Sequence, residues 1–115
     1  PSYAAKQATG VAGAAPGATV LLKGSGSIVA TPGELPFVIP TGNAALATAG
    51  TGDVLAGAIT ALVGQGLSAF DAARAGVYLH GRAGDLVAWR KSQSGLLASD
   101  VIEELPFAFR DVTLR

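Results

Sequence analysis

Residues 41–57 carry the sequence TGNAALATAGTGDVLAG, in which a loop of small residues runs into an apolar pattern with helical spacing. Glycines in such a loop allow backbone N–H groups to converge on one point. The positive end of the dipole of the following helix lies at the same point. This arrangement predicts a binding site for a phosphate or another anion.

Asp53 stands at the start of the predicted helix, where a carboxylate would repel a phosphate. A chain that keeps a carboxylate there is expected to use it on a substrate, as a general base. A plain helix start is the alternative, because Thr51 or Asp53 could accept hydrogen bonds from the first-turn N–H groups. The small-residue run 44–52 favours a ligand, since a helix cap needs no such run and close approach to the backbone does.

The composition indicates one modest domain with a core, since the 115 residues are 50% hydrophobic and 14% charged. Eight basic and eight acidic residues balance, so we expect no general affinity for nucleic acid or for an anionic membrane. Without cysteine the chain has no disulfide, thiolate metal site or cysteine nucleophile, and one histidine excludes a histidine-rich metal site. The chain has no methionine, not even at position 1, so either an initiator was removed before Pro1 or the chain is part of a longer protein. We prefer the second interpretation, on the ground of the resemblance described below.

The hydrophobic pattern predicts a weak helix over residues 3–11, then three short strands, then three helices. The strands are expected at 18–22, 28–30 and 37–39, as an antiparallel meander whose first strand is buried on both faces. Residues 31–34, TPGE, have the composition of a type II turn. The helices are expected at 54–63, at 69 to about 90 after an N-cap at Ser68, and at 101–105 after caps at Ser99 and Asp100, ending at Pro106.

The second of these helices has an apolar stripe rich in small residues, which suit close helix–helix packing: Phe70, Ala73, Val77, Gly81, Gly84 and Ala88. His80 lies in the middle of the helix, and a lone histidine there is more often a packed, hydrogen-bonded residue than a catalyst. Arg82 and Asp85 are three residues apart, so a local ion pair explains them. No Ser/His/Asp constellation is present.

The segment 23–27, KGSGS, follows the first predicted strand. Its lysine can meet a phosphate as a point charge, and its glycines and serines can supply hydrogen-bond donors. Taken alone, a solvated lysine in a hairpin connection is the preferred interpretation. The spacing of a Walker A loop is absent.

Five blocks of sequence, in this order, resemble the NAD(P)H-hydrate dehydratase family: 21–30 (LLKGSGSIVA), 40–43 (PTGN), 47–57 (ATAGTGDVLAG), 76–85 (GVYLHGRAGD) and 95–100 (GLLASD). The resemblance runs from about Val20 to Pro106. That family belongs to the ribokinase-like superfamily, so the resemblance implies an α/β fold, a three-layer α/β/α sandwich. Residues 1–115 are then expected to be the C-terminal part of a single domain, because the family's N-terminal half has no counterpart here.

The resemblance implies a metabolite-repair enzyme, a hydro-lyase that returns hydrated NADH or NADPH to the working cofactor. The family uses ADP or ATP with Mg²⁺, phosphorylates the substrate hydroxyl and then loses phosphate. The implied partners are this substrate and the nucleotide, in a cytoplasmic homo-oligomer. Because half of the family's pattern is missing, the chain alone is expected to show no turnover.

The resemblance also implies roles for individual residues. Asp53 would contact the hydrated nicotinamide and act as the base, and no residue is expected to be a metal ligand. The residues implied at the nucleotide site are Lys23, Gly24, Ser25, Gly26, Ser27, Asn43, Ala49, Gly50, Thr51 and Gly52. The sequence departs from the family at residues 43–46, NAAL, where the family usually has Asn-Pro-Gly-Met.

Two other functions stay open. A ribokinase-like kinase of a sugar or a vitamin precursor would share the anion loop and the helix after it. The vitamin-precursor kinases generally carry cysteine at the position of Asp53, and the sugar kinases lack the blocks at 79–85 and 95–100. The second alternative is a nucleotide-binding or oligomerising fragment without turnover, which an assay with hydrated NADPH would distinguish.

Overall fold

The computed structural model describes residues 18–23, 27–43, 46, 50–92 and 94–113. Three strands precede three helices: β1 (Val20–Leu22), β2 (Ile28–Ala30), β3 (Phe37–Val38), α2 (Thr51–Gly64), α3 (Ala69–Lys91) and α4 (Ala98–Thr113). The helix predicted at residues 3–11 lies outside the described residues. Over those ranges, no helix is both long enough and apolar enough to cross a membrane.

The strands form the predicted antiparallel meander, in the order β1-β2-β3. Leu21 pairs with Val29, and Val29 pairs in turn with Phe37, so β2 is the central strand. The turn between β2 and β3 is closed by the Glu34 N–H, which donates to the Thr31 carbonyl at 3.3 Å. The bounds of β2 agree with the prediction, whereas β1 and β3 are shorter than predicted.

The two faces of the sheet pack against different residues. Val29 is buried on the face that meets the helices, together with Ile39, Leu55 and Val77. Ile28 and Ala30 are buried on the opposite face, with Val20 and Leu22 packed against them.

The prediction that the first strand is buried on both faces is wrong, because all three residues of β1 are only half-buried. Within the described sheet, β1 pairs with a single neighbour, β2. A strand at the edge of a sheet is covered on its faces less completely than a central strand.

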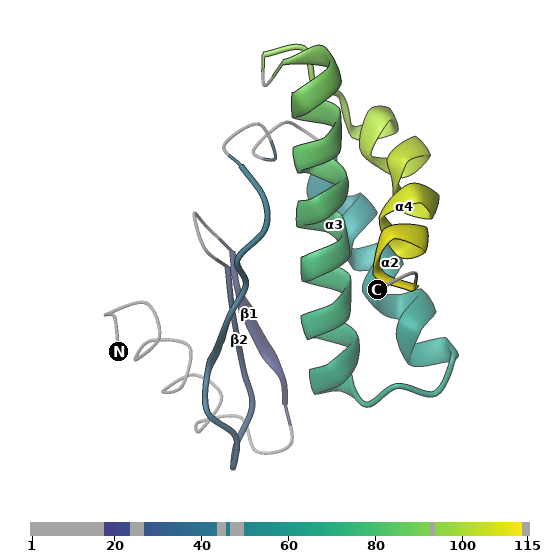
Figure 1. Ribbon diagram of the computed structural model, residues 1–115. Helices are drawn as coiled ribbons and strands as arrows, with labels where there is room; N and C mark the ends of the chain where they lie inside the picture. The colour runs from purple at the N-terminus through teal and green to yellow at the C-terminus, as the bar shows by residue number, and fades with distance from the viewer. Residues whose placement is uncertain (1–17, 24–26, 44–45, 47–49, 93, 114–115) are drawn as a thin grey trace.

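The helix α3 is the centre of the structure. It contacts β2, α2 and α4, and Figure 1 shows it between the sheet and α4. Its bounds agree closely with the prediction, and the Ser68 hydroxyl accepts the Asp71 N–H as the expected N-cap. Four residues of the predicted stripe are buried, Ala73, Val77, Gly81 and Gly84, whereas Phe70 and Ala88 are half-buried.

The helix α2 begins at Thr51, three residues before the predicted start. Its end agrees with the prediction, since the Gly66 N–H donates to the Val63 carbonyl and closes the last turn at 3.0 Å. The earlier start places Gly52 and Asp53 in the first helical turn, among the N–H groups that have no partner inside the helix.

The prediction that Pro106 ends the last helix is wrong, because α4 continues through it to Thr113. A proline removes the helical hydrogen bond to the residue four positions earlier, here Ile102. Ile102 is exposed, so water can bind its carbonyl. Ala108, beyond the proline, is completely buried with Val87 and Val101, and this burial favours continuation of the helix.

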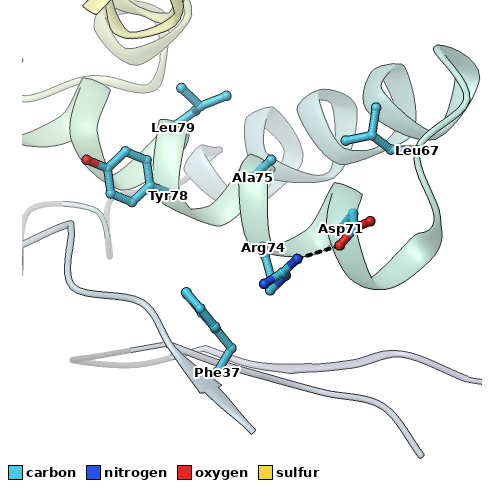
Figure 2. Close-up of a pocket in the computed structure, with 7 residues that line it drawn as sticks. All are labelled: Phe37, Leu67, Asp71, Arg74, Ala75, Tyr78 and Leu79. Atoms are coloured by element: carbon cyan, nitrogen blue, oxygen red, sulfur yellow. Dashed lines mark hydrogen bonds and ion pairs between the residues drawn. The ribbon is translucent and has the colours of Figure 1, made fainter. Parts of the chain in front are cut away.

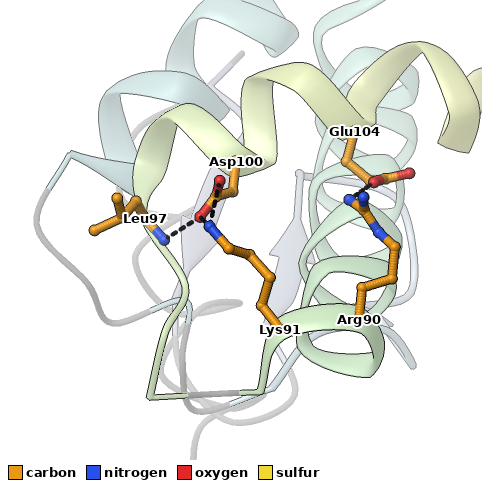
Figure 3. Close-up of polar contacts among 5 residues, drawn as sticks. All are labelled: Arg90, Lys91, Leu97, Asp100 and Glu104. Atoms are coloured by element: carbon orange, nitrogen blue, oxygen red, sulfur yellow. Dashed lines mark hydrogen bonds and ion pairs between the residues drawn. The ribbon is translucent and has the colours of Figure 1, made fainter.

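Polar contacts join the end of α3 to the start of α4 (Figure 3). Asp100 accepts the Leu97 N–H at 2.9 Å and the Lys91 ammonium at 3.0 Å, and Arg90 pairs with Glu104. The backbone N–H of Leu97, followed by Lys91, holds the pKa of Asp100 below its ordinary value. The helix α4 begins at Ala98, three residues before the predicted start, so Ser99 and Asp100 lie inside it and not before it. Asp100 still acts as a cap, because from within the first turn its carboxylate accepts the Leu97 N–H.

Candidate functional site

The first turn of α2 has no side-chain cap. Its N-cap residue is Gly50, with φ 89° and ψ −16°, a left-handed conformation that glycine adopts without steric cost. Glycine offers no side-chain oxygen to the N–H groups of the first turn. The positive end of this helix therefore lacks the acceptor that most N-cap residues supply.

Thr51 does not cap the helix with its hydroxyl, which was the alternative interpretation of this segment. Its Oγ1 points back and donates to the Leu46 carbonyl at 2.5 Å, and the residue is buried. Asp53 is exposed in the first turn. The carboxylate of Asp53 thus lies beside the N-terminus of α2, and the hydroxyl of Thr51 binds the backbone of Leu46, which precedes the helix.

Lys23 directly follows β1 and lies against the start of α2. Its Nζ is 3.0 Å from the position that a Cβ on Gly52 would occupy. The structure thus brings together two residues that the sequence assigned to one site from separate blocks. An ammonium beside the positive end of a helix is unfavourable alone, and an anion held between them would stabilise both.

His80 is buried on α3, and its Nε2 donates to the Thr51 carbonyl at 2.9 Å. Burial lowers the pKa of His80 below its ordinary value, the hydrogen bond to Thr51 raises it, and the charge of Lys23 lowers it further. Above the ordinary pKa of 6.5 the side chain is therefore mostly a neutral imidazole, and because the Thr51 carbonyl can only accept, the proton of this hydrogen bond lies on Nε2. This confirms the interpretation of His80 as a packed, hydrogen-bonded residue.

Asp85 binds the segment before the anion loop with both carboxylate oxygens. One oxygen accepts the Gly42 N–H at 3.0 Å, and the other accepts the Asn43 side-chain amide at 2.8 Å. Thr41 adds a third contact with α3, because its hydroxyl donates to the Tyr78 carbonyl at 2.9 Å. The predicted explanation of Asp85, a local pair with Arg82, missed these contacts with the loop.

The glycines of α3 allow this segment to lie directly on the helix. A Cβ on Gly81 would lie 2.8 Å from the Thr41 carbonyl carbon, and one on Gly84 would lie 2.6 Å from the Leu46 side chain. The prediction of helix–helix packing at these two positions is therefore wrong, since their neighbour is the segment before α2. Helix–helix packing of this kind occurs instead at Gly76, against Ile59 of α2.

The other residues predicted at the nucleotide site are placed only in part. Gly24, Ser25, Gly26 and Ala49 lie outside the described residues. The Ser27 carbonyl accepts the Ile39 N–H at 2.9 Å, just before β2.

Sequence reasoning missed the loop-holding face of α3. The signal was present, because residues 80 and 84 and residues 81 and 85 are each four positions apart and so share one face of a helix.

A second feature is a pocket of about 500 Å³ beside the start of α3 (Figure 2). Arg74 stacks over the rings of Phe37 and Phe70, at 5.2 and 4.7 Å from their centroids, and pairs with Asp71 at 2.5 Å. The lining residues are Phe37, Leu67, Asp71, Arg74, Ala75, Tyr78 and Leu79. None of the predicted site residues lines this pocket.

Comparison with known proteins gives consistent matches. A family model described as NAD(P)H-hydrate dehydratase matches residues 6–107. The bifunctional NAD(P)H-hydrate repair enzyme Nnr of Moorella thermoacetica is 45% identical over 95 residues, which are 83% of this chain and 18% of that enzyme. The ADP-dependent (S)-NAD(P)H-hydrate dehydratase of Neisseria meningitidis is 47% identical over 98 residues, 85% of this chain and 32% of that protein.

The fold also matches a solved structure, that of the ADP/ATP-dependent NAD(P)H-hydrate dehydratase of Bacillus subtilis, co-crystallised with ATP/Mg²⁺. The TM-score is 0.87 at 33% identity, and the match covers 93% of this chain and 38% of that chain. The chain thus spans well under half the length of these relatives. The likeness confirms the predicted α/β class and ribokinase-like fold. Together, the family model, the relatives and the shared fold show that this chain belongs to the NAD(P)H-hydrate dehydratase family.

Proposed function

We propose that the chain binds the phosphates of ADP or ATP between Lys23 and the first turn of α2, as part of a nucleotide-dependent dehydration of hydrated NADH or NADPH. The observation that supports it most is the approach of the Lys23 ammonium to Gly52, at a helix start whose N-cap has no side chain. Two sources of positive potential converge there, and a phosphate complements both.

In this proposal, Asp53 removes the proton from the substrate hydroxyl as its oxygen attacks the terminal phosphoryl group. A new O–P bond forms, and the bond to the departing nucleotide breaks. The electron pair of the ring nitrogen then expels the phosphate as the C–O bond breaks, and loss of a proton from the neighbouring carbon restores the double bond. Lys23 and the first-turn N–H groups stabilise the charge on the phosphoryl oxygens.

Ordinary interactions suffice for this role. A charge-assisted hydrogen bond contributes about 1.5–3 kcal/mol. A helix N-terminus adds about 0.3–1 kcal/mol to the binding of an anion. Lys23 and two first-turn N–H groups would together account for a nucleotide contact of useful strength.

We propose that Mg²⁺ accompanies the nucleotide. Among the residues that the structure describes, no group of three or more His, Asp or Glu side chains is placed to hold a metal. Mg²⁺ commonly takes most of its ligands from substrate phosphates and water, with one or two carboxylates. In this proposal the nucleotide phosphates and water hold Mg²⁺, and Asp53 stays available as the base.

The kinase of a small alcohol is less well supported, because the relatives that match the chain carry names of hydrate dehydratases or hydrate repair enzymes. For the chain alone, we propose binding of the nucleotide without turnover. The chain spans 32% of the Neisseria dehydratase, and we propose that it forms part of one ribokinase-like domain whose other segments complete the substrate pocket. A homo-oligomeric state and a cytoplasmic location stay predictions.

A chimera tests this function. Residues 20–113 would replace the matching segment of the Bacillus subtilis dehydratase, and the chain alone would be assayed beside it with hydrated NADPH and ADP or ATP. We expect the chimera to regenerate NADPH in a nucleotide-dependent reaction and the chain alone to show none. A phosphorylated product without NADPH would favour the kinase, and a folded chimera with neither product would contradict the proposal.

A further inference from the structure

We propose that His80 and Asp85 are positioning residues, which from one face of α3 fix both ends of the anion-binding segment 41–53. The inference rests on the proposed function, because it explains how Gly42 and the first turn of α2 keep the positions that a bound phosphate needs. Neither side chain would contact the substrate. Each acts through the backbone that it holds.

Asp85 fixes the beginning of the segment. Its two oxygens accept from the Gly42 N–H and from the Asn43 side chain, at 3.0 and 2.8 Å. A carboxylate that binds two donors of adjacent residues sets both their position and their orientation. The backbone thus enters the loop from a fixed point on α3.

His80 fixes the end of the segment. Its Nε2 donates to the carbonyl of Thr51, the first residue of α2, at 2.9 Å. The orientation of that peptide group sets the direction of the next N–H, that of Gly52, which lies beside Lys23. As a neutral imidazole, His80 supplies this hydrogen bond without placing a second cation next to Lys23.

Four residues of one face of α3 meet the segment in turn. His80 contacts Thr51, and Asp85 contacts Gly42 and Asn43. Between them, Gly81 and Gly84 leave room for the backbone of Thr41 and the side chain of Leu46. Because α3 is one continuous helix, these contacts fix the separation of Gly42 from Thr51.

Because Asp85 is charged, one substitution can distinguish its positioning role from the effect of its charge on the phosphate. A carboxylate near a phosphate site weakens phosphate binding, so Asp85→Asn should raise nucleotide affinity if only charge matters. A positioning role predicts the opposite, because asparagine offers one acceptor where the loop needs two. His80→Gln keeps a donor at a similar position, whereas His80→Leu removes it.

Calorimetric titration with ADP and with ATP/Mg²⁺ tests the inference on the 115-residue chain. We expect Asp85→Asn and His80→Leu to weaken binding by about tenfold or more, the loss of one hydrogen bond in a charged site. His80→Gln should remain close to the parent chain. The control is Ile28→Val, which trims a buried side chain on the sheet face opposite the one that packs on α2 and α3, and it should bind normally. Unchanged or tighter binding by Asp85→Asn would overturn the inference.

Amide hydrogen exchange, measured without nucleotide, separates this inference from the proposed function. In Asp85→Asn, exchange at Gly42 should be about tenfold faster than in the Ile28→Val control, because the Gly42 N–H donates to the Asp85 carboxylate and the variant weakens that hydrogen bond. Equal exchange in the two variants would overturn the positioning role. If the parent chain binds no nucleotide, the proposed function fails, and the exchange rates still decide whether α3 holds the segment.

Discussion

At the scale of single residues, the site is a balance of charges around one helix start. Lys23 brings a positive charge to Gly52, and Asp53 brings a negative charge to the same turn. The cation would serve binding and the carboxylate would serve chemistry. The two residues should therefore respond to substitution in opposite ways.

Asp53→Asn keeps the size of the side chain and removes its ability to accept a proton. In the chimera, we expect turnover to fall by about 10²–10⁴-fold, the usual contribution of a general base. Nucleotide affinity should hold or rise, because a negative charge near the phosphates is lost. Steady-state rates together with calorimetric affinities test both expectations. Near-normal turnover would remove Asp53 from the role of base.

Lys23→Ala should weaken the binding of ADP and ATP and reduce its dependence on salt, because a cation that faces phosphate is lost. The matched control is Lys91→Ala, in which an exposed lysine that pairs with Asp100 is removed. Titration at two salt concentrations measures both effects. If the two variants bind alike, Lys23 is a solvated lysine with no role in the site.

His80 should make the stability of the fold depend on pH. Burial lowers the pKa of His80 from its ordinary value of 6.5, so between the two values the unfolded chain binds more protons. The free energy of unfolding should be highest above pH 6.5 and fall as the pH drops toward the folded-state pKa. Urea denaturation as a function of pH measures this slope, and His80→Gln should flatten it. Asp71 and Asp100, whose pKa values are lowered from 3.8, change stability only in more acidic solution and do not obscure this slope. If His80→Gln has the same slope as the parent chain, the pH dependence does not come from His80.

At the scale of elements, the start of α2 and the end of α4 differ from the positions that local sequence patterns predict. The start of α2 was predicted late because Gly50 and Gly52 resemble a loop, although Gly52 is helical. The end of α4 was predicted early because proline usually stops a helix, whereas burial of Ala108 carries it past Pro106. By contrast, the bounds of α3 were predictable, because its cap at Ser68 and its periodic pattern are local.

Gly81→Ala tests the contact between α3 and the loop. Alanine favours a helix interior by about 1 kcal/mol over glycine. Here, however, the new Cβ would lie 2.8 Å from the Thr41 carbonyl carbon and 2.9 Å from the Gly42 nitrogen, so backbone must move. We expect a net loss of about 1–3 kcal/mol in the free energy of unfolding, the usual cost of overpacking.

The matched control for that substitution is Gly57→Ala in α2, where a Cβ would meet nothing within 4 Å. This variant should gain roughly 0.5–1 kcal/mol from helix propensity. Urea denaturation measures both variants. If Gly81→Ala gains stability as Gly57→Ala does, the loop does not pack on α3 as closely as described.

At the scale of the whole molecule, the sequence predicted the order of the elements, the antiparallel meander and the family. It could not predict from local pattern that Lys23 lies beside Gly52, because that contact depends on how the sheet packs against the helices. Only the resemblance of separate blocks indicated one shared site. The roles of His80 and Asp85 in holding the loop were equally hidden, because each had a sufficient local explanation.

The central claim is that a nucleotide binds where Lys23 meets the first turn of α2. The most direct test is a titration of the isotope-labelled chain with ADP or ATP and Mg²⁺, followed by the chemical shifts of the backbone amides. The claim predicts changes concentrated at Lys23, at Gly42 and at Thr51–Asp53, with little change around the pocket beside Arg74. Shifts that gather at that pocket instead, or no shifts at saturating nucleotide, would contradict it.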